Sequence, residues 1–253
     1  MRKAVAILIG ALVGLAAHGA TTNIVANKQG IDSSAAWVRD LSDASTHASL
    51  LLWMPMPSAS GLTNNYIQAG GVITNNGATW ADNVAGFSGS ASMIGPSALM
   101  PTNAPWTVAL WCKITNAVAL QYAFSASAGS GSTLHYHFNT ASGGVMRWRL
   151  DTTSGTSLLD DAIASYTNTW RHAALTYNGT SVVSYADGKP IVTNAATGPL
   201  SFTPANVGVG GVTAFGPYYW SGGIDDVRIY GTALTASQIS NQLYRVFKGK
   251  YGL

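Results

Sequence analysis

Two histidines and two arginines are the first candidate ligand-binding residues, because they alternate along two neighbouring predicted strands. His135 and His137 lie in one of these strands, and Arg147 and Arg149 lie in the next. Residues two apart in a strand share a face of the sheet, so we expect all four side chains on one outer surface. The guanidinium fork matches a carboxylate or a similar anion. The pattern therefore predicts a binding face for an anionic glycan, and an ordinary solvated face is the alternative.

The pairing of these two strands follows from their apolar positions. A turn over 139–144 is expected to join a strand over 133–138 to a strand over 145–151. Placing Tyr136 opposite Trp148 puts the apolar side chains of both strands on one face. On the other face, this register sets His135 opposite Arg149 and His137 opposite Arg147.

An aromatic segment over 215–220 is a second candidate surface, and it contains Phe215 and Tyr218. Aromatic side chains present a flat apolar face that suits stacking against a sugar ring, and they cost little entropy to fix. We therefore expect Phe215 and Tyr218 to contact a ligand.

The composition excludes several classes of protein. Only 9% of the 253 residues are charged, and all ten acidic residues are aspartate. Helical bundles and coiled coils draw on glutamate and lysine for their solvent faces, so they are excluded. A hydrophobic content of 47%, with eight Trp and eleven Tyr, excludes disorder. No cluster of Lys or Arg follows the N-terminus, so we expect no nucleic-acid partner.

The N-terminus has the pattern of an export signal over residues 1–20. Two basic residues precede an apolar run from Ala4 to Ala17, and small residues follow it. The run is shorter than the roughly 20 residues that span a bilayer, so the pattern predicts cleavage and no membrane insertion afterwards. Removing Arg2 and Lys3 lowers the formal net charge from +3 to +1, with 11 basic and 10 acidic residues left. We expect a protein secreted to the extracellular space or the cell surface.

Cys112 is the only cysteine, which excludes an intramolecular disulfide. Period-two spacing places it on the same face as Trp106, Val108 and Leu110. We expect a buried thiol that packs as a small apolar side chain.

From residue 49 onward, short apolar or alternating runs are separated by clusters of Gly, Asn, Ser and Pro. This spacing is typical of an all-β sandwich, and so many strands need two sheets. Asn178-Gly179 and Asp187-Gly188 predict hairpin turns. A capping box over Thr235 to Gln238 predicts one short C-terminal helix. We expect a leader segment over 21–48, one domain over 49–247 and a tail over 248–253.

Several segments resemble the laminin-G-like group of the concanavalin A-like superfamily. In chain order they are Phe87-Ser88-Gly89 with Pro101, the strand over 106–111, Trp170 to Tyr177, Tyr185 to Lys189, and Ser221 to Tyr230 with the helix that follows. The last segment is the most specific, and the resemblance covers roughly residues 50 to 245. It implies an antiparallel jelly-roll β-sandwich in which Trp220 faces the core.

This scaffold carries lectins, adhesion domains and glucanases, so the fold alone does not give the function. The glucanases that the chain resembles use a pair of glutamates, and this chain has no glutamate. Asp160 and Asp161 fall in a stretch that looks irregular, and the neighbours Asp225 and Asp226 are expected to point to opposite faces of a strand. We therefore expect no enzyme activity.

The resemblance also implies a weak calcium site, because related domains use an acid near the last strand together with a loop aspartate. Asp225 and Asp226 match the first element, whereas residues 61–66 carry amides in place of the loop aspartate. Hydrogen bonding within the strand is the alternative role of these aspartates. No other cofactor is expected.

Together these features predict a secreted, non-catalytic recognition module, with a role such as cell adhesion, that binds a glycan or another extracellular ligand such as an extracellular protein. The alternative is a structural or assembly subunit of an extracellular, surface or virion structure, which would associate with copies of itself.

Overall fold

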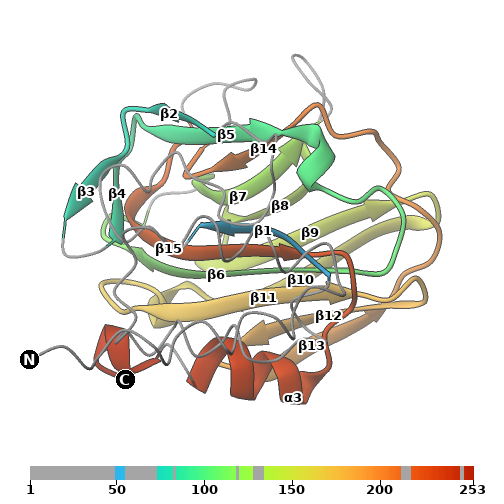
Figure 1. Ribbon diagram of the computed structural model, residues 1–253. Coiled ribbons are helices and arrows are strands. Elements are labelled where there is room, and N and C mark those ends of the chain that lie inside the picture. Colours follow the sequence, from blue (N-terminus) through green and yellow to red (C-terminus); the bar gives the residue numbers. More distant parts are fainter. Residues whose placement is uncertain are drawn as a thin grey trace, which may run out of the picture.

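The computed structural model describes residues 49–54, 73–81, 84–117, 120–127, 134–211, 218–245 and 248–253, and of residues 134, 135 and 163 it describes the backbone alone. In this part of the chain, two antiparallel sheets pack face to face and short helical segments follow (Figure 1). The predicted jelly-roll β-sandwich with a short C-terminal helix is confirmed. The predicted signal and leader, residues 1–48, lie outside the described residues.

The larger sheet has eight described strands. Their order is β13-β12-β11-β6-β15-β4-β3, and β1 also pairs with β15. The bounds are β1 (Leu50–Met54), β3 (Thr79–Ala81), β4 (Val84–Ser88), β6 (Trp106–Ile114), β11 (Arg171–Tyr177), β12 (Ser181–Ala186), β13 (Lys189–Ala195) and β15 (Ser221–Tyr230).

The smaller sheet has seven described strands in the order β10-β9-β8-β7-β14-β5-β2. The bounds are β2 (Thr74–Asn76), β5 (Ser92–Pro96), β7 (Tyr122–Ser127), β8 (Leu134–Ala141), β9 (Val145–Thr152), β10 (Gly155–Ala162) and β14 (Asn206–Val209). Two 3₁₀ turns, Ser97–Leu99 and Ile163–Ser165, lie in the connections.

Two predicted hairpin turns are confirmed at one edge of the larger sheet, where β11, β12 and β13 follow one another. Between β11 and β12, the Asn178 side chain accepts hydrogen bonds from the backbone amides of Thr180 and Ser181. Between β12 and β13, Asp187 and Gly188 have φ values of 48° and 75°. A two-residue turn of this type needs two left-handed residues, which explains the Asp-Gly pair.

The core lies between the sheets, and β6 shows why its sequence alternates. Its inward side chains, Trp106, Val108, Leu110, Cys112 and Ile114, are all buried in the main apolar cluster. The Cys112 thiol is therefore a core group, as predicted, and burial raises its pKa far above the ordinary value. Trp220 is also buried in this cluster, which confirms the expectation from the family pattern.

The outer face of the larger sheet is partly covered by the C-terminal helical segments. These are α3 (Ala236–Gln238), a π-helix over Ile239–Tyr244 and a 3₁₀ helix over Lys248–Tyr251 (Figure 1). The predicted capping box is confirmed, with Thr235 and Gln238 exchanging side-chain and backbone hydrogen bonds. Ile239 and Leu243 are buried in a second apolar cluster against β1, β6 and β11. None of the helices in the described ranges is long and apolar enough to cross a membrane.

The segment around Asp160 and Asp161 was expected to be irregular, and this expectation was wrong. It forms the edge strand β10, which pairs with β9 along its whole length. Glycine and aspartate are uncommon in strands, so they conceal the underlying pattern. Ser157 and Leu159 are nevertheless buried, and Leu158 between them is exposed.

Candidate functional site

The expected register between the two strands that carry the histidines and arginines was wrong by two residues. Tyr136 lies opposite Leu150, and Phe138 lies opposite Trp148. The reason is the turn, which spans only Ser142 to Gly144 because both of its glycines adopt left-handed backbone, with φ values of 88° and 73°. A shift of two keeps every side chain on its expected face. His137 therefore faces Arg149, and Asn139 faces Arg147.

Both arginines of this face already hold a carboxylate. Arg147 donates two hydrogen bonds of 2.7 Å to Asp160 on β10. Arg149 donates two, of 2.9 and 2.8 Å, to Asp151 on its own strand. The hydrogen bond with Asp160 raises the pKa of the Arg147 guanidinium. An anionic ligand would have to compete with both aspartates.

Two of the predicted site residues, His137 and Tyr218, both contact the ring of Tyr122. The ring of Tyr122 is 5.0 Å from the ring of His137 and 5.9 Å from the ring of Tyr218. His137 is buried, and burial raises the pKa of the Tyr122 hydroxyl. Tyr122 thus links Tyr218 of the predicted aromatic surface to His137 of the predicted histidine and arginine face. The side chain of His135 and all of Phe215 lie outside the described residues.

Asp225 and Asp226 lie at a bulge in β15, where two partner strands meet end to end. β4 pairs with β15 up to Ile224, and β1 pairs with it from Val227 onward. Asp226 has a φ of 49°, and the register with β6 shifts at this point. The regular alternation expected for the two aspartates therefore does not apply. Both side chains are buried.

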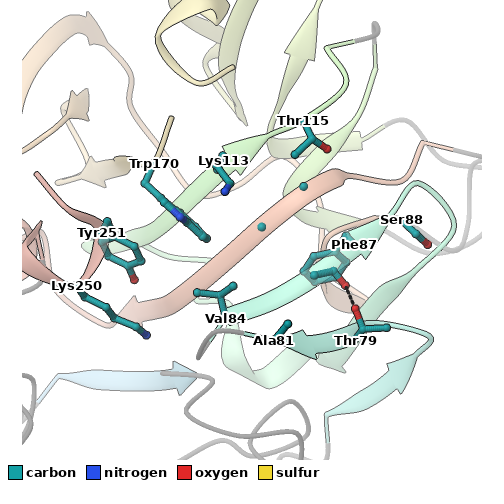
Figure 2. A pocket seen from close by; sticks show the side chains of 13 residues that line it. Thr79, Ala81, Val84, Phe87, Ser88, Lys113, Thr115, Trp170, Lys250 and Tyr251 are labelled. Carbon is teal, nitrogen blue, oxygen red and sulfur yellow. Dashed lines mark hydrogen bonds between the residues drawn. The ribbon is translucent and has the colours of Figure 1, made fainter. Parts of the chain in front are cut away.

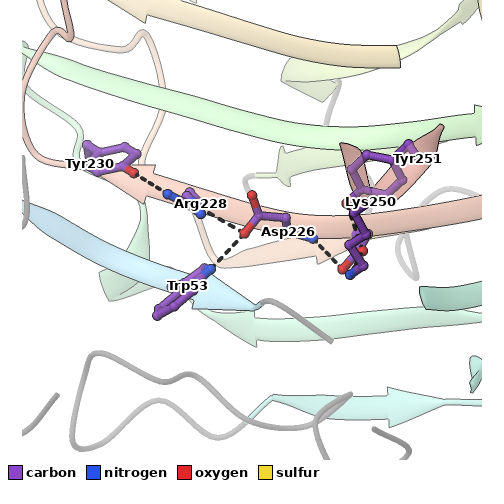
Figure 3. A network of polar contacts seen from close by, with 7 residues as sticks. Trp53, Asp226, Arg228, Tyr230, Lys250 and Tyr251 are labelled. Atoms are coloured by element: carbon purple, nitrogen blue, oxygen red, sulfur yellow. Dashed lines mark hydrogen bonds and ion pairs between the residues drawn. The ribbon is translucent and has the colours of Figure 1, made fainter. Parts of the chain in front are cut away.

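Asp226 is the centre of a buried polar network (Figure 3). One of its carboxylate oxygens accepts hydrogen bonds from the Trp53 indole at 2.7 Å and from Arg228 at 3.0 Å. The Arg228 guanidinium lies 5.2 Å from the Trp53 ring and donates to the Tyr230 hydroxyl at 3.3 Å. Burial raises the pKa of Asp226, and Arg228 opposes that shift.

Asp225 anchors the C-terminal residues. Its carboxylate accepts a hydrogen bond from the Tyr251 hydroxyl at 2.8 Å and one from the Lys250 amine. Burial raises the pKa of Asp225 to about 7, and Lys250 opposes the shift.

These contacts do not fit the predicted calcium site well. Calcium takes six to eight oxygen ligands, whereas Asp225 and Asp226 accept hydrogen bonds from an amine, a phenol, a guanidinium and an indole. Among the described residues, no group of three or more His, Cys, Asp or Glu side chains is placed to hold a metal ion. The geometry fits a structural role for both aspartates.

A groove of about 560 Å³ opens on the outer face of the larger sheet, beside the part that the helical segments cover (Figure 2). Strands β3, β4, β6 and β15 contribute to it, together with Trp170 and the C-terminal residues. It is lined by Thr79, Ala81, Val84, Gly86, Phe87, Ser88, Lys113, Thr115, Trp170, Gly222, Gly223, Lys250 and Tyr251.

The floor of the groove is backbone, because three adjacent positions are glycine. Gly86 of β4 lies opposite Gly223 of β15, and Gly222 is the next residue. A Cβ atom at Gly222 would lie 2.0 Å from the Lys113 carbonyl oxygen, and one at Gly223 would lie 2.6 Å from the Trp170 ring. Any larger residue would push on the neighbouring strand β6 or on the indole. The missing side chains therefore make room for the neighbouring strand β6 at Gly222 and for the indole, which lies over Gly223.

An aromatic wall bounds the groove on one side. Trp170, half-buried directly before β11, lies 4.8 Å from the ring of Tyr251. Tyr251 in turn stacks on Trp111 at 4.2 Å, and its hydroxyl is held by Asp225. The Lys113 amine lies 5.5 Å from the centre of the Trp170 ring. This wall offers a fixed apolar face with an amine beside it.

Sequence reasoning did not single out this groove. Trp170 was recognised as part of a family motif, but no local pattern shows that its ring reaches across to Gly223. Alternation along β6 does place Lys113 on the outer face, next to Trp111. That alternation was the available signal, and it identifies one residue only.

Solved structures of binding domains share the fold. Domain 4 of AbnA, a GH43 extracellular arabinanase from Geobacillus stearothermophilus in complex with arabinotriose, is 19% identical with a TM-score of 0.56. That match covers 77% of this chain and 98% of that one. Botulinum neurotoxin type C, whose cell entry depends on interaction with two ganglioside molecules, is 13% identical with a TM-score of 0.57, covering 79% and 51%. The binding domain of Paraclostridial Mosquitocidal Protein 1 is 14% identical with a TM-score of 0.55, covering 76% and 51%. This chain therefore spans about half the length of the two toxin structures. At these identities the likeness shows the fold alone.

No curated protein sequence matches the chain. A laminin-G family model, described as the concanavalin A-like lectin/glucanases superfamily, matches residues 87–240. This range covers more than half of the chain and includes Lys113, Trp170 and the two glycines of β15. The resemblance seen in the sequence motifs is confirmed, and the chain belongs to the concanavalin A-like lectin/glucanase superfamily.

Proposed function

We propose that the protein is a secreted, non-catalytic, lectin-like module that binds a glycan in the groove of the larger sheet. The observation that carries this proposal is the half-exposed Trp170 ring, which stands beside a floor of glycine backbone. A sugar ring stacks its C–H groups on such an indole while its hydroxyl groups reach backbone and side-chain partners. The groove volume of about 560 Å³ lies in the range of small-molecule sites.

The fold relatives support a glycan as the ligand. The arabinanase domain was solved with arabinotriose, and botulinum neurotoxin type C interacts with gangliosides. The sequence identities are too low to carry over a particular sugar or a binding position. The ligands named for these relatives favour a carbohydrate over other classes of ligand for this groove.

The lining residues support binding without catalysis. Glycoside hydrolysis uses two carboxyl groups that flank the scissile bond. Within the described ranges, the side chains that line the groove include no carboxyl and no imidazole group. The signal-like residues 1–20 support secretion of the module.

The test uses the purified chain from residue 21 onward on a broad glycan array, followed by affinity electrophoresis with each glycan that binds. We expect Trp170→Ala to weaken binding at least about tenfold, because the stacking face is lost. Trp80→Ala is the matched control, since Trp80 is 37% exposed and does not line the groove. Binding that Trp170→Ala leaves unchanged contradicts the proposal.

The face of His137, Arg147 and Arg149 is the second candidate surface for a glycan. The double variant Arg147→Ala/Arg149→Ala tests it in the same assay, with loss of binding as the supporting result. The assembly role is tested by the mass in solution of the purified chain. Discrete monomers that bind a glycan favour recognition, and polymers favour assembly.

A further inference from the structure

The two lysines of the groove differ in their partners. The Lys250 amine is held by the buried Asp225 carboxylate. The Lys113 amine forms no ion pair with any carboxylate in the described ranges, and its partner is the Trp170 ring at 5.5 Å. Lys113 is half-buried on β6 and lines the groove, where the described residues offer its ammonium group no counter-charge.

The charged side chains among the described lining residues of the groove have one sign. Among the described residues that line it, two are lysines and none is acidic. The Asp225 carboxylate, which holds Lys250 and Tyr251 of the lining, is fully buried. From the described lining, an anion that enters the groove therefore meets positive charge.

Moving the Lys113 amine toward a ligand costs little. A cation over an aromatic ring at a partly exposed site is a weak contact, and the lysine stem is flexible. The arginines of the smaller sheet differ in this respect, because each would have to release an aspartate that it holds through two hydrogen bonds. Among the candidate surfaces, the groove has the more available cation.

We infer that the groove recognises an acidic glycan, with a sugar ring stacked on Trp170 and its carboxylate or sulfate group bound by the Lys113 ammonium. The inference rests on the proposed function and names its ligand class. The groove, with a volume of about 560 Å³, leaves room for the ring, and Lys113 supplies a charge-assisted hydrogen bond beside it. Neutral sugars that stack equally well would lack this bond.

The test compares matched pairs of glycans that differ in charge. Polygalacturonate is compared with its methyl ester, and dextran sulfate with dextran, together with the acidic and neutral members of the array. We expect the acidic member of a pair to bind about tenfold more tightly, and its affinity to fall as salt is raised. Equal binding of acidic and neutral members overturns the inference and leaves the proposed function intact. Loss of all glycan binding overturns both.

Variants then identify the cation responsible. Lys113→Gln is expected to weaken binding of the acidic glycan about tenfold and to leave neutral-glycan binding unchanged. Lys113→Arg should restore most of the affinity, because it keeps the charge. Lys189→Gln, at an exposed lysine outside the groove, is the control for the change in net charge. If Lys189→Gln weakens binding as much as Lys113→Gln, the inference is wrong.

A polyaspartate peptide provides the last comparison. Its charge is similar but it has no sugar ring to stack, so we expect weak binding that Trp170→Ala does not change. Peptide binding as tight as that of the acidic glycan would show recognition of charge alone and would overturn the inference.

Discussion

Removing the buried guanidinium of Arg228 should be one of the most damaging single changes in the protein. Arg228 and Asp226 are 1% and 4% exposed, and they form an ion pair of 3.0 Å beneath Trp53. Arg228→Met keeps much of the side-chain volume but leaves the Asp226 carboxylate buried with one hydrogen-bond donor from the Trp53 indole. The uncompensated charge is the cause of the expected loss.

The magnitude follows from the burial of the pair. Breaking a buried ion pair by removing one partner costs about 3–5 kcal/mol. That is a large fraction of the roughly 5–15 kcal/mol that stabilises a typical domain. With a urea dependence of about 2–3 kcal/mol/M, the unfolding midpoint should fall by roughly 1–2 M. Asp226→Asn/Arg228→Met, which removes both charges, should cost less than the sum of the single variants.

The effect should also depend on pH. Burial raises the pKa of Asp226 in the folded state, and Arg228 opposes this shift, so Arg228→Met raises the pKa further. An acid with a raised folded-state pKa is penalised when ionised, so the deficit is full above that pKa. It shrinks as pH falls toward the unfolded value of 3.8. We therefore expect a smaller difference from wild type at pH 4.5 than at pH 7.5.

The assay is urea unfolding followed by tryptophan fluorescence at both pH values. Arg147→Met is the matched control, because the pair of Arg147 with Asp160 is 28% and 39% exposed and should contribute less than about 1 kcal/mol. If Arg228→Met costs no more than Arg147→Met, or if the single variants add without coupling, the reasoning from burial is refuted.

Three further expectations concern the groove and its surroundings. Gly223→Ala places a Cβ atom 2.6 Å from the Trp170 ring, so the indole must move; glycan affinity should fall about tenfold, and unchanged affinity would contradict the stacking geometry. Tyr251→Ala removes the ring stacked on Trp111 and should cost about 2–4 kcal/mol in urea unfolding, whereas Tyr251→Phe should cost about 1 kcal/mol; equal costs would show that the ring is not the main contribution. Burial and Arg228 lower the pKa of His172 from 6.5 to about 3, so the unfolded chain binds a proton at higher pH than the folded chain, and stability is lost as pH falls from 6.5 toward 3. The melting temperature of His172→Gln should therefore fall less than that of wild type between pH 7 and pH 4. An equal fall would exclude His172 as the cause.

Local rules predicted the elements well where the sequence itself determines them. Alternation along 106–114 identified the inward face of β6, including Cys112. Asn178-Gly179 and Asp187-Gly188 predicted the hairpins. Gly179, Asp187 and Gly188 adopt the left-handed backbone, and the Asn178 side chain accepts a hydrogen bond within its own turn. The capping box at Thr235 predicted where the helical segment begins.

Features that depend on pairing between strands were harder to predict. The register of β8 with β9 was wrong because it depends on two consecutive left-handed glycines, Gly143 and Gly144, whose turn type the sequence does not specify uniquely. The groove brings together β4, β6, β15 and the C-terminal residues, which are far apart in the chain. Trp170 and Gly223 lie too far apart in the sequence to fall within one strand or helix, so periodicity could not reveal their contact.

The place of β1 in the larger sheet has a consequence for how the chain reaches its folded state. β1 pairs with the last strand, β15, and its Trp53 bonds to Asp226, 173 residues away in sequence. β15 also covers one edge of β6. During synthesis, β1 therefore has no partner strand until nearly the whole domain has been made. One edge of β6 likewise stays unpaired until residues 221–230 are available. Pairing over such separations is slow, and an unpaired apolar strand edge favours aggregation in the interval. A chain that stops before residue 221 is expected to aggregate rather than fold.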